Sequence, residues 1–417
     1  MKLVTVPQLP LEGPKDLVLR FPDEWDVEVF NMAGHDRPAI TMDQIRAALN
    51  QPLGTPPLRE LAKGKQEVVI IFDDYTRGMR WNAVAHAVLA DLAAAGIRDD
   101  QIRFVCSLGT HGAATRTPDG SEAGRRHRQP LPDLQHNAFS LDNLHLGKTK
   151  TWGIDIYANP EVMACDLKIA LGAVTPHPIN GFGGGSKNIL PGIVSYQTIV
   201  DHHLKSFKIA FDAMNEAAKT GAQSTVGLGI YDPGNRPAID VDDEAATMVG
   251  LDFGINVVAN GRGQAVGIWA GEIGQVFVEA LTDGRDNYAT VPAVDKDIVI
   301  ANAFYKANEP MIALLPAGAL AEEVRRVGGA GSQHAGRPHD PLFPGRLGGN
   351  TPGQAAARQR GQPGRDRRRS AVLQRVPAPR GVMVDRAQGE DHPPQRLGRR
   401  HRRAAAQVSG RGIGGGL

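Results

Sequence analysis

The chain is expected to be an α/β protein with a parallel sheet, and three apolar segments predict this. EVVIIFD (67–73), IRFVCSL (102–108) and DLKIALG (166–172) are β-rich runs, each followed by polar or glycine-rich sequence. A helical stretch follows the first run, from about Trp81 to Ala95. This strand, loop and helix unit is the building block of parallel sheets.

Further elements follow in the second half of the chain. Residues 254–259 and 264–269 are predicted strands, and a helix is predicted near 274–282. DIVIANA (297–303) predicts one more strand, and we expect a domain hinge around 282–296. No repeat of solenoid period is present.

Polar residues come directly after the first three predicted strands. In open parallel sheets, ligands bind in the crevice outside the carboxyl ends of the strands. We therefore expect one site to be formed by Asp74, Arg77, His111, His177 and Lys187.

The run from His177 to His203, HPINGFGGGSKNILPGIVSYQTIVDHH, is the most informative part of the sequence. Its glycines at 181, 183, 184 and 185 lose conformational entropy on folding, a cost tolerated where backbone turns sharply or lies against a ligand. We expect a flat or phosphorylated ligand there.

Two common nucleotide motifs do not fit this run. A P-loop needs Gly before the lysine and Ser or Thr after it, whereas Lys187 lies between Ser186 and Asn188. A dinucleotide fingerprint would need a third glycine where Ser186 stands. A nicotinamide dehydrogenase therefore stays only as a weak alternative.

Each candidate site residue also has a structural interpretation. Asp74 could simply be a cap of the next helix. Arg77, three residues later, favours instead a ligand with hydroxyls and an anionic group, because the guanidinium fork binds such a group in two places. His111 could be a turn residue, yet a histidine within GTHG titrates near neutrality, as a general base should. Lys187 could be a solvated charge, but after the glycines it favours a phosphate contact or a covalent bond.

The adjacent histidines His202 and His203 are the candidate metal ligands. Neighbours on a helix point about 100° apart, so the two cannot readily bind one metal together. At most one is a ligand, and a structural role is expected for the other. The sequence has no HExxH or CxxC pattern, so any metal is not held by an ordinary zinc site.

The last 91 residues differ from the rest in composition. From residue 327 on, 44 residues are Arg, Gly or Pro, with 17 Arg against 5 acidic residues. Residues 1–326 hold 30 basic and 40 acidic residues, so the formal net charge of +2 averages two unlike segments. This net charge gives no reason to expect a nucleic-acid or membrane partner for residues 1–326.

Three interpretations of this tail stay open. It could be a nucleic-acid-binding arm, although RGG-type repeats and interleaved aromatics are absent. It could be a disordered extension with too little apolar sequence to fold. The abrupt change in mid-domain favours a third interpretation, a frameshift in GC-rich coding DNA.

The sequence also predicts the cellular compartment and whether the chain spans a membrane. Cys106 and Cys165 have apolar neighbours in a chain without a signal peptide, which indicates buried thiols in a reducing cytoplasm. No uncharged apolar run approaches ~18 residues, so a membrane-spanning helix is not expected.

Together with GTHG and DDYTRG upstream, the lysine run resembles lactate racemase and its homologues, the nickel-pincer nucleotide enzymes. The resemblance covers roughly Ile45 to Ala313 and implies a 2-hydroxy-acid racemase or epimerase that works by hydride abstraction and return. It implies a nickel-pincer nucleotide, the Ni(II) complex of pyridinium-3,5-bisthiocarboxylic acid mononucleotide, covalently attached to Lys187. Cofactor biosynthesis proteins are then the implied partners, besides the substrate.

The resemblance also assigns roles to single residues. It implies nickel ligation by His203 and not His202, and acid/base roles for His111 and His177. The remaining cofactor-binding residues that it implies are Asp74, Tyr75, Thr76, Arg77, Gly184 and Gly185.

The sequence departs from the family pattern in two places. Where the family carries Tyr-Gln-Ala-x-Lys, this chain has Tyr305, Lys306, Ala307, Asn308 and Glu309. Arg77, Lys306 and Glu309 are therefore the expected substrate contacts, and a 2-hydroxy acid other than lactate is expected. The second departure is that nothing after Val327 resembles the family's second domain.

The predicted organisation has three parts. Residues 1–285 form a Rossmann-like domain that binds cofactor and nickel, and 296–326 begin a smaller α/β C-terminal domain that is truncated or out of frame. Residues 327–417 are the tail. A non-catalytic truncated homologue that binds cofactor at most is thus an alternative to the racemase.

Overall fold

The structure is a computed structural model that describes residues 1–8, 15–112, 133–222, 224, 226–227, 229–231, 237–291, 297–300 and 302. All of these belong to the first of two compact units, Met1–Gly345. The second unit, Arg346–Leu417, lies outside the described residues.

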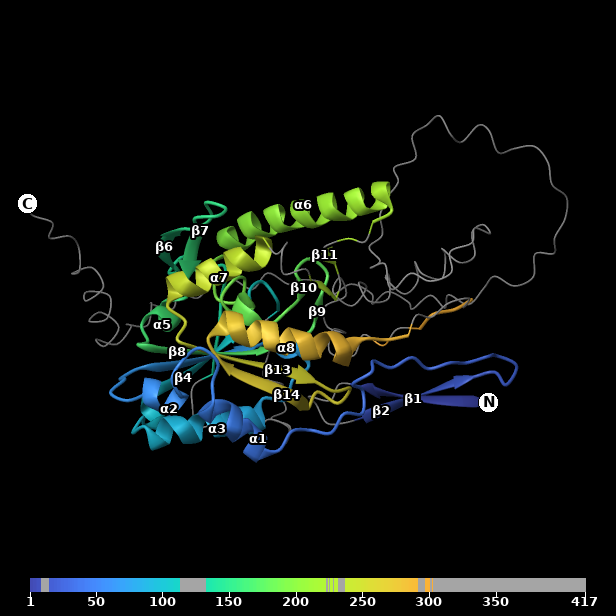
Figure 1. Cartoon of the computed structure of the whole chain (residues 1–417), viewed down its shortest axis with the longest axis horizontal. Helices are drawn as coiled ribbons and strands as arrows, with labels where there is room; N and C mark the ends of the chain where they lie inside the picture. The colour runs from blue at the N-terminus through green and yellow to red at the C-terminus, as the bar shows by residue number, and fades with distance from the viewer. Residues whose placement is uncertain are drawn as a thin grey trace, which may run out of the picture. The chain divides into compact units, whose positions relative to one another are not determined.

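The centre of the described part is a six-stranded sheet with the order β14-β13-β8-β3-β4-β5 (Figure 1). Adjacent strands are parallel except for the antiparallel edge pair of β13 and β14. The α/β fold with a parallel-dominated sheet is therefore confirmed. The strands are β3 (Val68–Asp73), β4 (Ile102–Ser107), β5 (Asp133–Gln135), β8 (Leu167–Ala173), β13 (Phe253–Ala259) and β14 (Ala265–Gly271).

Helices cover both faces of this sheet (Figure 1). One face packs against α1 (Met42–Asn50), α2 (Leu58–Leu61) and α3 (Asn82–Ala94). The other face packs against α5 (Pro160–Met163), α7 (Pro237–Val249) and α8 (Ile273–Tyr288). The long helix α6 (Tyr196–Thr220) lies beside α7 on that second face.

The sequence of β3 shows why a central strand of this sheet contains a continuous apolar run. Val68 and Ile70 are buried in the core under α1 to α3, whereas Val69 and Ile71 are buried in the core under α5 and α7. Successive side chains of a strand point to opposite faces, and here both faces are covered. A continuous apolar run is the result.

The remaining elements are small. The hairpin β1 (Lys2–Gln8) and β2 (Lys15–Phe21) comes first in the chain. Three further two-stranded ribbons are β6 (Leu144–Lys148) with β7 (Asp155–Ala158), β9 (Pro176–His177) with β10 (Gly181–Phe182), and β11 (Val226–Gly227) with β12 (Ile230–Tyr231). The 3₁₀ turns are η1 (Tyr75–Arg77), η2 (Asp99–Gln101) and η3 (Gly185–Asn188).

The last predicted elements need correction. Helix α8 continues to Tyr288, so the predicted hinge at 282–296 begins too early. Asp283 and Asn287 both accept hydrogen bonds from Arg37, and these bonds tie the last turns of α8 to the N-terminal segment.

The predicted strand DIVIANA is also wrong where the structure describes it. Residues 297–300 and 302 are not in a strand. Ile298 and Ile300 are 59% and 60% exposed, because no described strand lies beside them to bury their side chains. The predicted domain boundary at residue 285 lies inside α8, and the division into three parts stays a prediction, since 303–417 lie outside the described residues.

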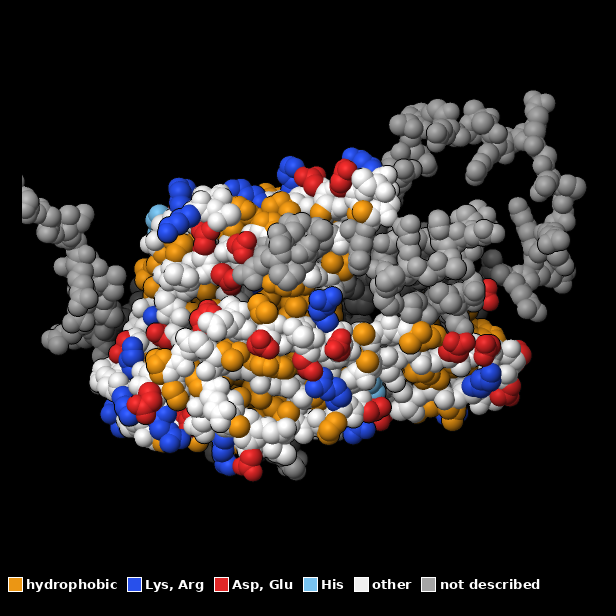
Figure 2. Space-filling view, in the orientation of Figure 1, with side chains coloured by type: hydrophobic (Ala, Val, Ile, Leu, Met, Phe, Trp, Pro, Cys, Tyr) orange, Lys and Arg blue, Asp and Glu red, His pale blue; other side chains and the backbone are white. Residues whose placement is uncertain are grey.

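The visible surface carries Lys and Arg side chains interspersed with Asp and Glu (Figure 2). Within the described ranges, none of the helices combines the length and the apolar character needed to cross a membrane.

Candidate active site

The carboxyl ends of β3, β4 and β8 meet at one edge of the sheet, because these three strands are adjacent and parallel. Asp74 follows β3, His111 follows β4, and the segment with His177 and Lys187 follows β8. The predicted convergence of polar residues at this edge follows from this strand order.

Asp74 is buried and fully engaged in hydrogen bonds. One carboxylate oxygen accepts from the backbone N–H of Thr76 at 2.8 Å and from its hydroxyl at 2.5 Å. The other oxygen bonds to Nδ1 of His111. Burial raises the pKa of Asp74, but the bond to His111 and the charge of Arg77 outweigh it, so the pKa lies below its usual range. Asp74 is therefore a carboxylate at neutral pH.

The bond to Asp74 fixes the proton position on His111. A carboxylate accepts only, so Nδ1 of His111 is the donor. In the neutral ring, Nε2 then carries a free lone pair. His111 is thus oriented as a base, with Asp74 stabilising the imidazolium that forms when Nε2 takes up a proton.

His177 is in the opposite hydrogen-bonding state. Its Nδ1 accepts from the backbone N–H groups of Ile179 at 3.3 Å and Asn180 at 3.2 Å. An Nδ1 that accepts leaves the proton of the neutral ring on Nε2. His177 lies in β9, opposite Gly181 of β10, and this ribbon leads into the lysine turn.

The lysine turn, defined as Gly184 to Asn188, needs glycine at its start. Gly184 has φ +89° and Gly185 has φ +59°, values that favour glycine. A Cβ on Gly184 would lie 2.7 Å from Val174, and one on Gly185 would lie 3.0 Å from the Phe277 ring. The glycine run therefore lets the turn pack directly against its neighbours.

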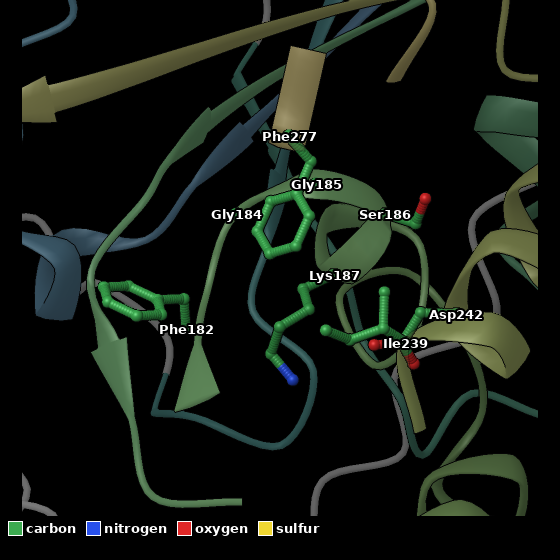
Figure 3. A pocket seen from close by; sticks show the side chains of 8 residues that line it. All are labelled: Phe182, Gly184, Gly185, Ser186, Lys187, Ile239, Asp242 and Phe277. Carbon is green, nitrogen blue, oxygen red and sulfur yellow. The ribbon is translucent and has the colours of Figure 1, made fainter. Parts of the chain in front are cut away.

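Lys187 leaves this turn beside a small pocket (Figure 3). Phe182, Ile239 and Phe277 give the pocket apolar walls, and Asp242 adds a carboxylate. Burial lowers the pKa of Lys187, Asp242 opposes this, and the charge of Arg77 lowers the pKa further. A lower pKa increases the fraction of neutral amine, which is the nucleophilic form.

His203 lies in the second turn of α6 and is held as a neutral ring. Its Nδ1 donates to the carbonyl of Ile199 at 3.0 Å, so Nε2 keeps its lone pair. Burial, with the charge of Lys187 next, lowers the pKa of His203 to about 3. A neutral imidazole with a backbone partner on Nδ1 is the form in which histidine binds a metal.

His202 has a structural environment, as expected for one of the two histidines. It is 1% exposed, its ring stacks on Trp152, and its Nε2 lies 3.1 Å from an oxygen of Asp242. The second oxygen of Asp242 accepts from the side-chain amide of Asn180 at 3.1 Å. The contacts of His202 tie α6 to α7.

Electrostatic interactions connect most of the predicted site residues. Lys187 interacts with Arg77, His203 interacts with Lys187 and His111, and Asp74 interacts with His111 and Arg77. His177 lies in the ribbon of β9 and β10. The side chain of Tyr75, and both Lys306 and Glu309, lie outside the described residues.

Several polar residues around the lysine turn were not predicted from the sequence. Asn256 and Asn188 are buried beside the lysine turn, and Asp242 and Asp243 lie on the helix that packs against it. The sequence signal that could have indicated them is a polar residue at a position where its neighbours are apolar. Asn256 interrupts the strand FGINVVA, and Asp242 occupies a buried position of α7.

Asp73, the last residue of β3, predicts a pH effect on stability. Burial raises its pKa to about 7, against lowering by Arg77 and by the Ala173 N–H, which donates to its carboxylate at 2.5 Å. The unfolded value is 3.8, so the wild type loses free energy of unfolding between about pH 4 and pH 7. Asp73→Asn should abolish that loss.

The difference in unfolding free energy between Asp73→Asn and wild type should thus rise over this range, by roughly 4 kcal/mol at most. Urea unfolding from pH 4.5 to 8.5 measures it. Asp43→Asn, at a side chain that is 92% exposed, controls for the loss of one charge. A difference that does not vary with pH would contradict the assignment.

Among the described residues, no group of three or more His, Cys, Asp and Glu is arranged to hold a metal ion. Lys187 and His203 have side chains that could hold a bound group and a metal ion, because burial lowers the pKa of the lysine amine and keeps the imidazole neutral.

Comparison with known proteins gives a consistent result. Residues 13–214 match the family model of the lactate racemase N-terminal domain. The chain is 29% identical over 260 residues to the lactate racemase of Thermoanaerobacterium thermosaccharolyticum, covering 62% of this chain and 57% of the relative. It is 27% identical over 298 residues to the lactate racemase of Lactiplantibacillus plantarum, covering 69% of this chain and 64% of the relative.

One solved structure supports the fold. The lactate racemase apoprotein from Thermoanaerobacterium thermosaccharolyticum superposes with a TM-score of 0.52 at 22% identity, covering 71% of this chain and 64% of that chain. The sequence alignments with the two curated lactate racemases span less than two thirds of the length of either relative.

Proposed function

Because this chain belongs to the lactate racemase family through its N-terminal domain, we propose that it is a racemase or epimerase of a 2-hydroxy acid. The observation that carries the proposal is the complementary state of two histidines at one sheet edge. His111 offers an unprotonated Nε2 and His177 offers a protonated one. Inversion at a carbon that bears a hydroxyl needs one group to take the hydroxyl proton and another to return it.

The protein residues have distinct tasks in this scheme. Nε2 of His111 accepts the hydroxyl proton, and Asp74 stabilises the charge that forms on the ring. Nε2 of His177 carries a hydrogen that bonds to the substrate oxygen on the other side, and the ring transfers a proton to that oxygen when it is in the imidazolium form. In the reverse direction the two histidines exchange roles. Arg77 binds the substrate carboxylate in two places, with Lys306 and Glu309 as further proposed contacts.

We propose that Lys187 holds a nickel-pincer nucleotide covalently and that His203 is a nickel ligand. When bound, this group supplies the acceptor that takes hydride from the α-carbon and returns it. The other residues that we propose to contact this group are Asp74, Tyr75, Thr76, Arg77, Gly184 and Gly185. The proteins that make this cofactor are the proposed partners.

The experiment that tests the function uses full-length protein produced together with the cofactor-making enzymes and nickel. The mass of the peptide with Lys187 should increase by that of a nucleotide, and one enantiomer of a 2-hydroxy acid should yield the other. An unmodified Lys187 in folded protein would refute the proposal and favour a non-catalytic homologue.

His203→Ala should separate metal binding from covalent attachment. Loss of the only proposed protein ligand should lower the nickel content about tenfold or more, while the modified fraction of Lys187 changes less than twofold. Metal analysis and peptide mass measure the two quantities. His145→Ala, at a side chain that is 48% exposed, is the control. Equal loss of nickel and nucleotide would contradict the role of His203.

A further inference from the structure

Three of the four residues of η3 are tied to other elements. The Gly185 N–H donates to Oδ1 of Asn256 in β13 at 3.0 Å. The Ser186 hydroxyl donates to Asp243 of α7 at 2.6 Å. The Asn188 side-chain amide donates to the carbonyl of Leu171 in β8 at 2.6 Å. Lys187 is the member of η3 whose side chain extends into the pocket instead (Figure 3).

The side chain of Asn256 bonds to the turn, and burying this amide costs folding free energy that packing alone would not offset. It is fully buried in a strand whose other residues are apolar or glycine. A buried amide destabilises unless both its polar ends are bonded. Both ends of Asn256 are satisfied, since Oδ1 accepts from Gly185 and Nδ2 donates to the Ile255 carbonyl at 3.1 Å.

The space around Asn256 is tightly packed. A Cβ on Gly172 of β8 would lie 3.2 Å from Nδ2 of Asn256 and 3.4 Å from Nδ2 of Asn188. Asn188 in turn accepts from the Ser107 hydroxyl of β4 at 3.2 Å. The two asparagines therefore close around Gly172 and link η3 to three strands of the sheet.

We propose that Asn256 is a positioning residue for Lys187: its bond to the Gly185 N–H fixes the turn from which the lysine amine reaches the pocket. Only the identity of the group that Lys187 binds rests on the proposed function. Position matters here because covalent bond formation needs the amine at a defined distance and angle from the carbon that it attacks.

The test compares Asn256→Leu, which keeps the side-chain shape without the acceptor, with Asn256→Asp, which keeps the acceptor. Protein produced with the cofactor-making enzymes and nickel is analysed for the modified fraction of Lys187 by peptide mass. Asn256→Leu should lower this fraction about fivefold, the effect of one hydrogen bond, and Asn256→Asp should restore it to within about twofold. Asn287→Leu is the matched control, because Asn287 is also buried but bonds to Ala259 and Arg37, away from the turn.

A second arm uses cofactor-free protein and trace acetylation with acetic anhydride at neutral pH. The rate at Lys187 relative to the exposed Lys208 should fall about threefold or more in Asn256→Leu, since a lysine released from the pocket is hydrated and mostly protonated. Wild-type values for Asn256→Leu, or an equal loss in Asn287→Leu, would overturn the proposal. If the wild type itself carries no nucleotide, the proposed function fails, and the acetylation arm still decides the role of Asn256.

Discussion

Replacing Lys187 with Ala should remove all covalent modification from the protein and reduce racemisation to background. The amine is the only proposed point of attachment, so the expected loss is complete and not partial. Lys187→Arg should fail equally, because a guanidinium stays protonated and is not a nucleophile. Peptide mass and conversion of a single enantiomer measure the two losses.

The environment of Lys187 gives the physical reason for this large effect. Burial and the charge of Arg77 lower its pKa, and they outweigh the opposing effect of Asp242. An exposed lysine has no such environment, so Lys208→Ala, on the surface of α6, should leave both measurements unchanged. Retention of a nucleotide-sized adduct in Lys187→Ala would show that the group is attached elsewhere.

Replacing His111 or His177 with Ala should stop turnover while the cofactor stays bound. Removal of a positioned acid or base lowers turnover by about 10²–10⁴. Each variant should be slow in both directions, since every cycle needs one histidine to take the proton and the other to return it. Rates from each pure enantiomer, beside the mass of the Lys187 peptide, measure this.

The matched control for this pair is His86→Ala, at an exposed position of α3. It should keep both the cofactor and the wild-type rate. A variant of His111 or His177 that keeps full activity in both directions would contradict the two-histidine scheme. Loss of the nucleotide together with activity would instead assign that histidine to cofactor binding.

The central strands could be predicted from the sequence because their signal is local. In β3, two buried faces produce an uninterrupted apolar run that needs no knowledge of the partner strands. The end of α8 could not be predicted in this way. It depends on hydrogen bonds from Arg37, about 250 residues earlier in the chain. The DIVIANA prediction was wrong because β propensity alone does not supply a neighbouring strand.

The candidate site was predictable where it follows the strand ends. Asp74, His111 and the lysine turn all occupy the expected edge of the sheet. The supporting residues were not, because they act through the tertiary structure. Asn256 reaches Gly185 across 71 residues of sequence, and the interpretation of His203 as a neutral ring needs the Ile199 carbonyl. Sequence spacing contains neither relationship.

The position of β8 in the sheet has a consequence for how the protein is divided. The recognised domain ends at residue 214, yet β8 needs β13 on one side, and β13 begins at Phe253. A fragment cut at residue 214, where the family model ends, would leave β8, whose residues are all buried, as an unpaired sheet edge open to other chains. The segment that the family model covers is thus shorter than the segment that builds the sheet, and the strand it leaves out is the one that carries Asn256.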